Sequence, residues 1–356
     1  MDYSKYYTPL PIAKLLINQL KISPPEKIVD ICCGSCNLLS AAKMRWSKAM
    51  LYGADIADHI VSNVIFKKID GRTYALSHQK EFPLVLANPP FDYLDKKNEF
   101  PQLFQPPFDS CSSSRLEVEM LIANLIMLKD EGTLLIIMPS SFVEGETHNE
   151  VRKIIARHYQ IKAIIELDER TFGTSYIHSY ALIIKKRICK RYICKLMYAE
   201  KTGDDFSLYQ TNEVTSRDLV KGDWNGKQAT SKLNGLDIKR GSVSSSDFTE
   251  EGQAILHTAK LSDEWRPSVR RVAYNVKSNA YAEDGDIIVS RIGKSAGKWC
   301  VYAGEKMPIS DCLYRIKDAD GKVYEKIQGK TFDLKLRGVA TQFITMSDFK
   351  NWIDSL

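Results

Sequence analysis

The sequence lacks a long hydrophobic run and a recognisable export signal. Its longest apolar stretch, LLIIMP, is much shorter than the roughly 20 residues of a membrane-spanning helix. The N-terminal segment MDYSKYYTPLP contains no apolar core of a secretory signal. These absences argue against a membrane protein or a secreted protein. They favour a cytoplasmic location, with no membrane partner.

The eight cysteines form no metal-binding pattern. Cys32, Cys33 and Cys36 lie close together, but no second CxxC pair and no Cys/His set completes a zinc site. Disulfides are rare in a long chain that carries no export signal. We therefore expect free thiols and no bound metal ion.

Length, composition and charge set broad limits. The chain has 356 residues, more than one hydrophobic core usually supports, so we expect two domains. Its hydrophobic content of 44% and its charged content of 26% are typical of globular proteins. A net charge of +6 is compatible with nucleic-acid binding but does not establish it, because many basic proteins bind no nucleic acid.

Strand-like and helix-like segments alternate through the first part of the chain. Apolar runs predict strands, and amphipathic patterns with helical periodicity predict helices between them. The predicted strands are residues 27–31, 51–55, 83–87, 133–138, 161–167 and 180–185, and the predicted helices are residues 12–20, 38–44, 117–128 and 151–158. This alternation is typical of an α/β domain built on a parallel sheet.

The character of the sequence changes near residue 200. The segments KTGDDF and WNGKQATSKLNG are polar and rich in turn residues, and from Val243 onward the apolar runs are short and β-like. We therefore predict two domains, residues 1–200 and residues 201–356. The second is expected to be the smaller one, of mixed α+β structure.

Three acidic residues follow three successive predicted strands. Asp30 precedes a turn that contains Gly34, Asp55 ends the second strand, and Asp70-Gly71 closes an apparent third strand that comes before the run 83–87. In doubly wound sheets, ligands bind beside such positions. A single glycine in the turn argues against a dinucleotide, whose pyrophosphate needs a richer glycine pattern, and is compatible with S-adenosylmethionine, which has no phosphate. Each acid alone is more often a helix cap or a turn residue.

The most specific motif is the segment Asn88-Pro89-Pro90-Phe91, which directly follows the apolar run 83–87. The prolines lack an N–H group and end the strand, leaving the Asn88 side chain and the Pro89 carbonyl as exposed acceptors. Two acceptors aimed at a conjugated amine draw its nitrogen toward sp³ geometry and free the lone pair for attack on a methyl group. Phe91 can stack on a base that has left the duplex.

The motif leaves alternatives open. The same chemistry fits other conjugated nitrogens, namely adenine in RNA, the N4 amine of cytosine in DNA, or a glutamine side chain. A purely structural interpretation is a Pro-Pro turn that ends a strand.

Five segments in this order resemble the gamma class of amino-methyltransferases. They are YYTPLPIAKLL, VDICCGSCNLL, GADI, DG and NPPF, and the resemblance covers most of residues 5–185. The class includes adenine-N6 DNA methyltransferases of restriction-modification systems and the modification subunits of type I systems. The resemblance therefore implies a Rossmann-like domain that uses S-adenosylmethionine to methylate the N6 amine of adenine.

The resemblance also implies a role for individual residues. The implied cofactor contacts are Tyr7, Thr8, Pro9, Asp30, Ile31, Cys32, Cys33, Gly34, Asp55, Ile56, Asp70 and Gly71. Asp55 corresponds to the ribose-binding acid, Ile56 to a residue packed on the adenine, and Asp70 to the acceptor of the adenine amine. The implied catalytic residues are Asn88, Pro89, Pro90 and Phe91. Phe91 would stack on the flipped base, and Phe172 is either a second stacking residue or plain core packing.

One position departs from the family pattern. Cys36 stands where a second glycine is usual, so its side chain is expected to crowd the methionine end of the cofactor. This departure keeps a rival hypothesis open, a non-catalytic DNA-binding or specificity protein. The intact NPPF motif argues against that rival.

Residues 285–316 resemble the target-recognition domains of type I specificity subunits and of fused type II enzymes. Arg291, Lys294 and Lys298 alternate with glycines on a predicted loop that can approach DNA closely, although a solvated hairpin would look similar. The irregular stretch 95–115 after the catalytic motif is either a loop that covers DNA or the flipped base, or a passive insertion.

Taken together, the two resemblances imply site-specific N6 methylation of a flipped adenine in double-stranded DNA. The implied partners are double-stranded DNA and a cognate restriction endonuclease, with the chain acting as a monomer or a homodimer. Almost no chain precedes Thr8, so no endonuclease is expected on this chain. A bacterial or viral origin and association with the nucleoid follow from the same resemblance.

Overall fold

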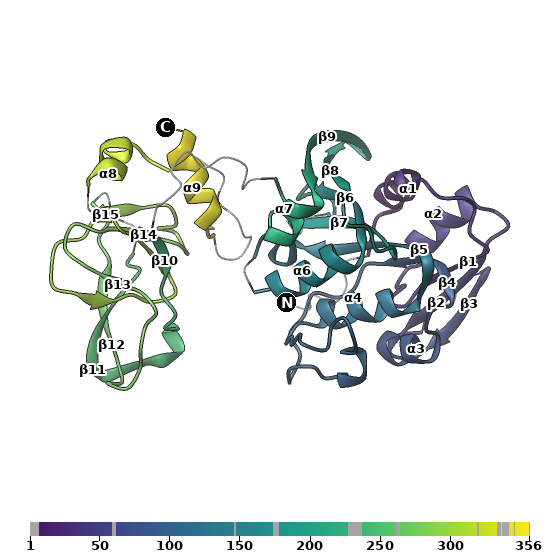
Figure 1. The fold of residues 1–356 in the computed structure, drawn as a ribbon, viewed down its shortest axis with the longest axis horizontal. Coiled ribbons are helices and arrows are strands. Elements are labelled where there is room, and N and C mark those ends of the chain that lie inside the picture. Colours follow the sequence, from purple (N-terminus) through teal and green to yellow (C-terminus); the bar gives the residue numbers. More distant parts are fainter. Residues whose placement is uncertain are drawn as a thin grey trace. The chain divides into compact units, whose positions relative to one another are not determined.

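The computed structural model describes residues 7–58, 62–145, 147–173, 178–226, 237–260, 262, 264–318, 320–332, 336, 342–344 and 346–355. The chain divides into two compact units, Met1–Gly226 and Lys227–Leu356 (Figure 1).

A nine-stranded sheet forms the centre of the first unit. Its strands are β1 (Lys27–Asp30), β2 (Met50–Asp55), β3 (Val64–Lys68), β4 (Phe82–Ala87), β5 (Leu128–Pro139), β6 (Gln160–Leu167), β7 (Ser179–Lys185), β8 (Ile193–Thr202) and β9 (Asp205–Thr215). They follow the order β3-β2-β1-β4-β5-β7-β6-β8-β9. Strands β1 to β5 pair in parallel, whereas β7 lies antiparallel between β5 and β6. The direction of winding reverses between β1 and β4, and this is where such sheets bind ligands.

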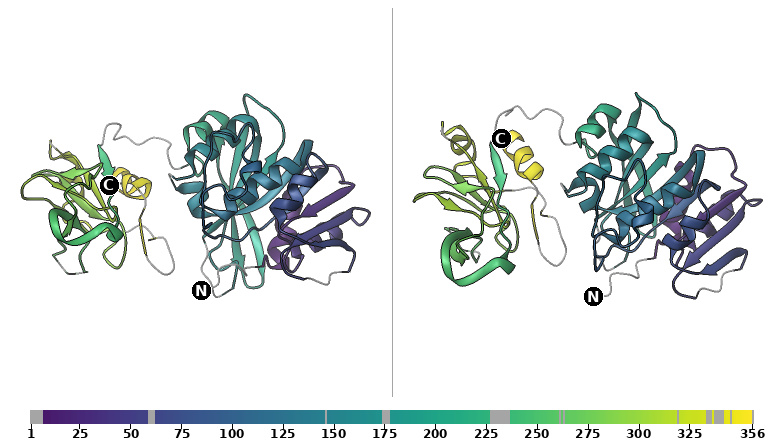
Figure 2. Two further views of the ribbon diagram at one scale, coloured as in Figure 1. Left: turned by 90° about the horizontal axis from the view of Figure 1, so that it is seen from below. Right: turned by 60° about the horizontal axis from the view of Figure 1, so that its bottom comes forward.

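Helices cover both faces of this sheet (Figure 2). They are α1 (Leu10–Gln19), α2 (Asn37–Arg45), α3 (Gly71–Ser77), α4 (Leu116–Met127), α5 (Ser140–Glu144), α6 (Asn149–His158) and α7 (Ser216–Lys221), with a short 3₁₀ turn η2 (Pro101–Leu103). In β4, Leu84 and Leu86 pack with α1 and α2, while Val85 and Ala87 pack with α3, α4 and α6. A strand buried on both faces needs an unbroken apolar run, as residues 83–87 show.

The first unit extends past the predicted boundary at residue 200. Strand β8 pairs in parallel with β6 and antiparallel with β9, so the polar segment KTGDDF is the turn of a hairpin within the same sheet. Farther along the chain, Leu219 and Trp224 are fully buried in the core of this unit. The predicted boundary was wrong because β9 is largely exposed. Its polar side chains interrupt the apolar run by which a buried strand can be recognised in a sequence.

The second unit is a smaller mixed α+β structure, as predicted. Its strands are β10 (Ile238–Arg240), β11 (Phe248–His257), β12 (Ser268–Val272), β13 (Tyr281–Ala282), β14 (Ile287–Ser290), β15 (Trp299–Val301), β16 (Met307–Pro308) and β17 (Leu313–Ile316). Its helices are α8 (Lys322–Ile327) and α9 (Met346–Ser355), with a 3₁₀ turn η3 (Ser245–Asp247). Strands β10, β17, β14 and β15 form an antiparallel sheet, and β11–β12 and β13–β16 form two separate ribbons. Helix α9 buries Phe349 and Trp352 against one face of that sheet, and α8 buries Val323 and Ile327 in the same core.

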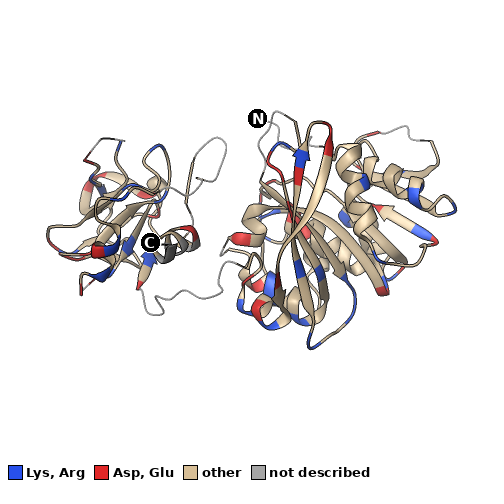
Figure 3. Ribbon diagram, turned by 90° about the horizontal axis from the view of Figure 1, so that it is seen from above, with Lys and Arg blue, Asp and Glu red and all other residues tan. Residues whose placement is uncertain are grey.

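Charges of both signs are interspersed along both units (Figure 3). Among the described residues, no helix is long and apolar enough to cross a membrane.

Candidate active site

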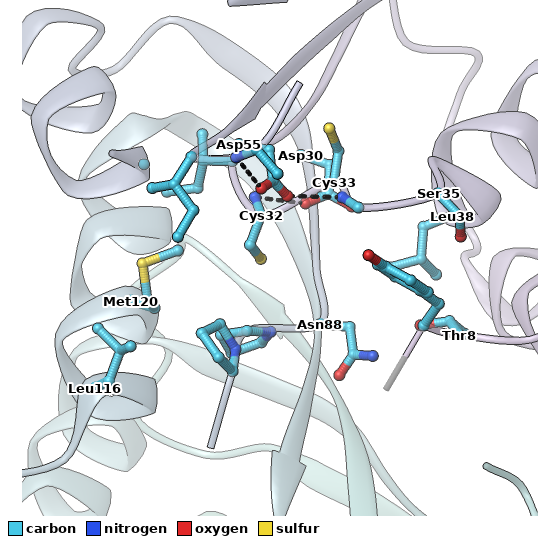
Figure 4. A pocket seen from close by; sticks show the side chains of 18 of the residues that line it. Thr8, Asp30, Cys32, Cys33, Ser35, Leu38, Asp55, Asn88, Leu116 and Met120 are labelled. Carbon is cyan, nitrogen blue, oxygen red and sulfur yellow. Dashed lines mark hydrogen bonds between the residues drawn. The ribbon is translucent and has the colours of Figure 1, made fainter. Parts of the chain in front are cut away.

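A pocket of about 270 Å³ lies in the first unit at the carboxyl ends of β1 and β4. It is lined by Tyr7, Thr8, Asp30, Ile31, Cys32, Cys33, Gly34, Ser35, Asn37, Leu38, Asp55, Ile56, Ala57, Asp70, Gly71, Arg72, Asn88, Pro89, Pro90, Phe91, Leu116, Met120 and Phe172. Figure 4 shows Asn88 and Thr8 on one side of this pocket and Asp30 and Asp55 on another. The fold therefore gathers the predicted catalytic residues and all the predicted cofactor residues except Pro9 in one place.

Asp30 ends β1 and is almost fully buried, with 2% of its surface exposed. Its carboxylate accepts a hydrogen bond of 3.0 Å from the backbone N–H of Cys32. Burial raises the pKa of Asp30 to about 7, although the hydrogen bonds from Cys32 oppose the shift. A buried carboxylate of this kind gains stability when a cationic group pairs with it.

Asp55 ends β2 and is fixed by two backbone donors. Its carboxylate oxygens accept from the N–H of Gly34 at 2.9 Å and from the N–H of Ala57 at 3.0 Å. Next to it, Ile56 is 73% exposed and lines the pocket. An exposed apolar side chain beside an anchored carboxylate suits a nucleoside, which presents a flat base and ribose hydroxyls.

The segment before α1 closes another side of the pocket. Gly34 has a positive φ of 47°, and a Cβ atom there would lie 2.4 Å from the Tyr7 ring, so only glycine lets the ring pack on this turn. Thr8 is 5% exposed, and its hydroxyl has no hydrogen-bond partner among the described residues. Pro9, also predicted to contact the cofactor, is the N-cap residue of α1 and lies outside the pocket lining.

Asp70 lies in the pocket but has a structural role as well. It is the N-cap of α3 and accepts from the backbone N–H of Arg72 at 2.8 Å. The Arg72 guanidinium also binds both carboxylate oxygens, with its closest contact at 2.8 Å. Burial would raise the pKa of Asp70, but the hydrogen bonds from Arg72 outweigh burial and lower it. At Gly71, a Cβ would lie 2.2 Å from the Ile31 carbonyl oxygen, so this glycine allows α3 to start against the end of β1.

Cys36 does not crowd the pocket, which corrects the prediction for this position. It has a left-handed conformation with φ of 57° at the start of α2, which explains why a glycine suits the position. Its side chain is fully buried in the core formed with α1 and α2, and it is absent from the pocket lining.

The predicted catalytic segment lies directly after β4. Asn88, Pro89, Pro90 and Phe91 all line the pocket. The Cys32 thiol faces the backbone of Asn88, so the cofactor turn and the catalytic segment are in contact. Phe91 and Phe172 are both half-buried, pack against the core and line the pocket, so each has an exposed face available for a ligand.

Several lining residues were not predicted from the sequence. Leu116 and Met120 come from α4, and Arg72 comes from α3. Asn37 donates to the Thr8 carbonyl at 2.9 Å and ties the N-terminal segment to α2. Asn37 lies within the motif VDICCGSCNLL and Arg72 directly follows the motif DG, but nothing in the sequence places α4 beside the pocket.

In the second unit, the predicted DNA-binding residues lie in and beside the turn between β14 and β15. Lys294 is exposed, Lys298 is half-exposed, and the Nε atom of Arg291 donates to the Asp311 carbonyl at 2.8 Å. Hydrogen bonds between buried hydroxyl groups stabilise this turn. The Oγ atoms of Ser290 and Ser295 lie 2.9 Å apart, and each is hydrogen-bonded to the Oγ1 atom of Thr258. Arg291 therefore belongs partly to the interior of this unit, whereas Lys294 does not.

The strand order, the switch point and the pocket define the class, a Rossmann-like domain with the fold of S-adenosylmethionine-dependent methyltransferases. The chain belongs to the N-6 DNA methylase family, whose profile matches residues 2–229.

Individual relatives are distant. The chain is 23% identical over 222 residues to the methylase subunit of the type I restriction enzyme MpnII of Mycoplasma pneumoniae, which covers 52% of this chain and 41% of that subunit. The chain thus spans less than half the length of this relative.

Solved structures share the fold. The methyltransferase subunit of a type I restriction-modification system from Streptococcus thermophilus aligns over 63% of this chain and 59% of its own, with 18% identity and a TM-score of 0.51. The type IIG restriction endonuclease BpuSI aligns over 98% of this chain and 58% of its own, with 11% identity and a TM-score of 0.54.

The pocket residues fit S-adenosylmethionine, the cofactor of this family. The buried carboxylate of Asp30 suits the amino group of the methionine part, and the anchored carboxylate of Asp55 suits the ribose hydroxyls. The unpartnered hydroxyl of Thr8 offers one further polar contact.

Proposed function

We propose that this protein transfers a methyl group from S-adenosylmethionine to the N6 amine of an adenine flipped out of double-stranded DNA. The observation that carries the proposal is the placement of Asn88-Pro89-Pro90-Phe91 in the same pocket as Asp30 and Asp55. The family assignment supports DNA as the substrate and adenine as the base. Phenylalanine at the end of the motif, rather than a motif that begins with serine, favours adenine over cytosine.

In the proposed mechanism the protein positions the amine and changes its geometry. S-adenosylmethionine supplies an electrophilic methyl group. The side-chain oxygen of Asn88 and the carbonyl of Pro89 accept the two amine hydrogens and free the nitrogen lone pair. Phe91 and Phe172 hold the base between their exposed faces. No strong base is needed, since the amine becomes acidic only after methyl transfer, and positioning accounts for most of the rate.

We infer that the second unit recognises the target sequence. Its support is the resemblance of residues 285–316 to target-recognition domains, together with the exposed Lys294 on a turn held by buried hydroxyl groups. Such a turn presents a cation to phosphates or to guanine edges at a small entropic cost.

A restriction endonuclease is the partner this function implies. The named relative is a subunit of a restriction enzyme, so a shared complex with nuclease and specificity subunits is one form of the proposal. The other form is an independent monomer or homodimer. Either would act where the DNA lies, in the cytoplasm and on the nucleoid.

The test replaces Asn88 with alanine. Asn88→Ala is expected to lower methyl transfer to DNA by at least about 1,000-fold, because both positioning and activation of the amine are lost. Binding of S-adenosylhomocysteine, measured by calorimetry, should stay within a few-fold of wild type. A matched control is Asn212→Ala, at an exposed position on β9.

Wild-type turnover by the Asn88 variant would contradict the mechanism. Methyl product found on RNA, on cytosine or on protein, and not on adenine in DNA, would replace the proposed substrate. Sequencing that detects modified bases in host DNA after expression distinguishes these results and gives the target site.

A further inference from the structure

One arginine beside the pocket bridges three carboxylates from separate parts of the chain. The guanidinium of Arg72 contacts Asp70 at 2.8 Å, Glu99 at 2.7 Å and Glu119 at 2.8 Å. Asp70 precedes α3, Glu99 lies in the segment after the catalytic motif, and Glu119 lies in α4. Arg72 itself lines the pocket.

The centre of this arrangement is buried, whereas the side chains of Asp70 and Glu99 are 32% and 33% exposed. The side chain of Glu119 is 0% exposed and that of Arg72 is 10% exposed. The guanidinium also stacks on the Phe100 ring, 4.1 Å from its centre. Removing one member of the buried Arg72–Glu119 pair leaves the other charge uncompensated, so these two side chains depend on each other. Lysine cannot replace the arginine, because an ammonium group lacks the planar fork that reaches several acceptors.

Hydrogen bonds from Arg72 already occupy both carboxylate oxygens of Asp70. A carboxylate has about four lone-pair sites, and Asp70 already accepts from three N–H groups of Arg72, one of which is shared between its two oxygens. These contacts engage both oxygens, and the backbone N–H of Thr73 also acts on the carboxylate. The Asp70 side chain is still 32% exposed, and Arg72 sets the direction in which its exposed edge faces. A ligand donor in the pocket meets that edge in this direction only while Arg72 stays in place.

The other end of the bridge lies in the segment that follows Phe91. Besides the Arg72–Glu99 contact, the backbone N–H of Phe100 donates to Glu119 at 3.3 Å. The same segment is tied to the start of α4 through Asn98, which pairs with Ser113 in both directions at 2.8 and 2.9 Å. The segment of residues 95–104, which follows the catalytic motif, is thus held in place by hydrogen bonds, and Arg72 is its contact with α3.

We propose that Arg72 is a positioning residue that couples the adenine-binding carboxylate Asp70 to the segment Asp95–Phe104 after the catalytic motif. The inference rests on the proposed function, in which Asp70 accepts the amine of the cofactor adenine. Arg72 aims the exposed edge of the Asp70 carboxylate at that amine and at the same time anchors Glu99. Because such coupling is reciprocal, cofactor binding stabilises the docked segment, and docking strengthens cofactor binding.

The first experiment measures base discrimination by the full chain. S-adenosylhomocysteine and S-inosylhomocysteine differ at position 6 of the purine, which is an amine donor in the first and a carbonyl acceptor in the second. Wild type is expected to prefer the adenine compound by on the order of tenfold, the value of one hydrogen bond to a charged acceptor. Arg72→Lys should keep the fold but reduce this preference to less than about threefold, as should Asp70→Asn.

The second experiment measures the docked segment by hydrogen–deuterium exchange. In wild type, S-adenosylhomocysteine is expected to slow exchange in residues 95–104. Glu99→Gln breaks only the anchor, so it should lose the added protection and, by reciprocity, bind S-adenosylhomocysteine more weakly than wild type while it still prefers the adenine compound. Glu131→Gln is a matched control, because its exposed ion pair with Lys185 lies on β5 and β7.

Each outcome decides a different point. If wild type bound neither compound, the proposed function would fail and this inference with it. If wild type preferred adenine and Arg72→Lys kept that preference, only the role of Arg72 in aiming Asp70 would be overturned. Equal protection of residues 95–104 in wild type and in Glu99→Gln would overturn the coupling. A purely structural arginine would lower the melting temperature and leave both readouts unchanged.

Discussion

At the scale of single residues, Asp30 gives the pocket a pH dependence. Its pKa is raised to about 7 by burial, so below pH 7 the group is mostly neutral in the protein without cofactor. Pairing with the amino group of the cofactor requires the carboxylate. Affinity for S-adenosylhomocysteine is therefore expected to fall by on the order of tenfold from pH 7.5 to pH 5.5, as calorimetry can measure.

The stability of the cofactor-free protein should change in the opposite direction. Because the folded-state pKa is raised, protonation of Asp30 favours the folded state, and the free energy of unfolding should decrease as pH rises from about 4 to about 7. Asp30→Asn stays neutral at every pH, so this variant should bind weakly with a flat pH profile. An affinity that depends on pH equally in wild type and in the variant would assign the effect to another group.

At the scale of elements, the basic residues in the turn between β14 and β15 have different roles, although the sequence predicted DNA binding for all of them. Lys294 is exposed to solvent, whereas Arg291 is partly buried and bonded within the unit. Lys294→Ala should weaken DNA binding and reduce the slope of log affinity against log salt by about 1, with no change in melting temperature, since the side chain is exposed. Arg291→Ala should lower the melting temperature, because the Nε bond to the Asp311 carbonyl is lost from a partly buried position.

Both effects are measurable by fluorescence anisotropy with duplex DNA over a salt series and by thermal denaturation. Lys322→Ala is a suitable control, because Lys322 is an exposed lysine on α8 of the same unit. A Lys294 variant that bound DNA with unchanged affinity and salt slope would exclude this turn from the interface.

At the scale of the whole molecule, the position of the division between the units is testable with fragments. A fragment of residues 1–200 ends inside β8 and lacks β9 and α7, so it loses the buried Leu219 and Trp224. It should unfold without cooperativity or aggregate through the exposed strand edge. A fragment of residues 1–226 should show a cooperative transition by near-ultraviolet circular dichroism and bind S-adenosylhomocysteine. Equal stability of the two fragments would contradict the observed division.

Local patterns predicted much of the first unit. Nearly all predicted strands and helices appear within two residues of their expected ends, because strands buried on both faces produce continuous apolar runs and amphipathic helices keep their period. Strand β5 begins five residues before its predicted start, and β8 and β9 were missed, since exposed faces dilute the apolar pattern with polar residues.

The candidate site divides in a similar way. Sequence alone was enough to find the motif at residues 88–91 and the acids at the ends of β1, β2 and β3. The chemistry of each depends on its own residue type and on a strand that ends beside it. The sequence also determined that a cofactor without phosphate suits the turn at Gly34.

What only the tertiary structure decided is which distant elements complete the pocket and how charges are shared. Helix α4 lies beside the catalytic segment, and Cys36 is buried away from the pocket. Arg72 joins three carboxylates that no spacing connects, since such contacts depend on how the sheet is wound and covered rather than on neighbours along the chain.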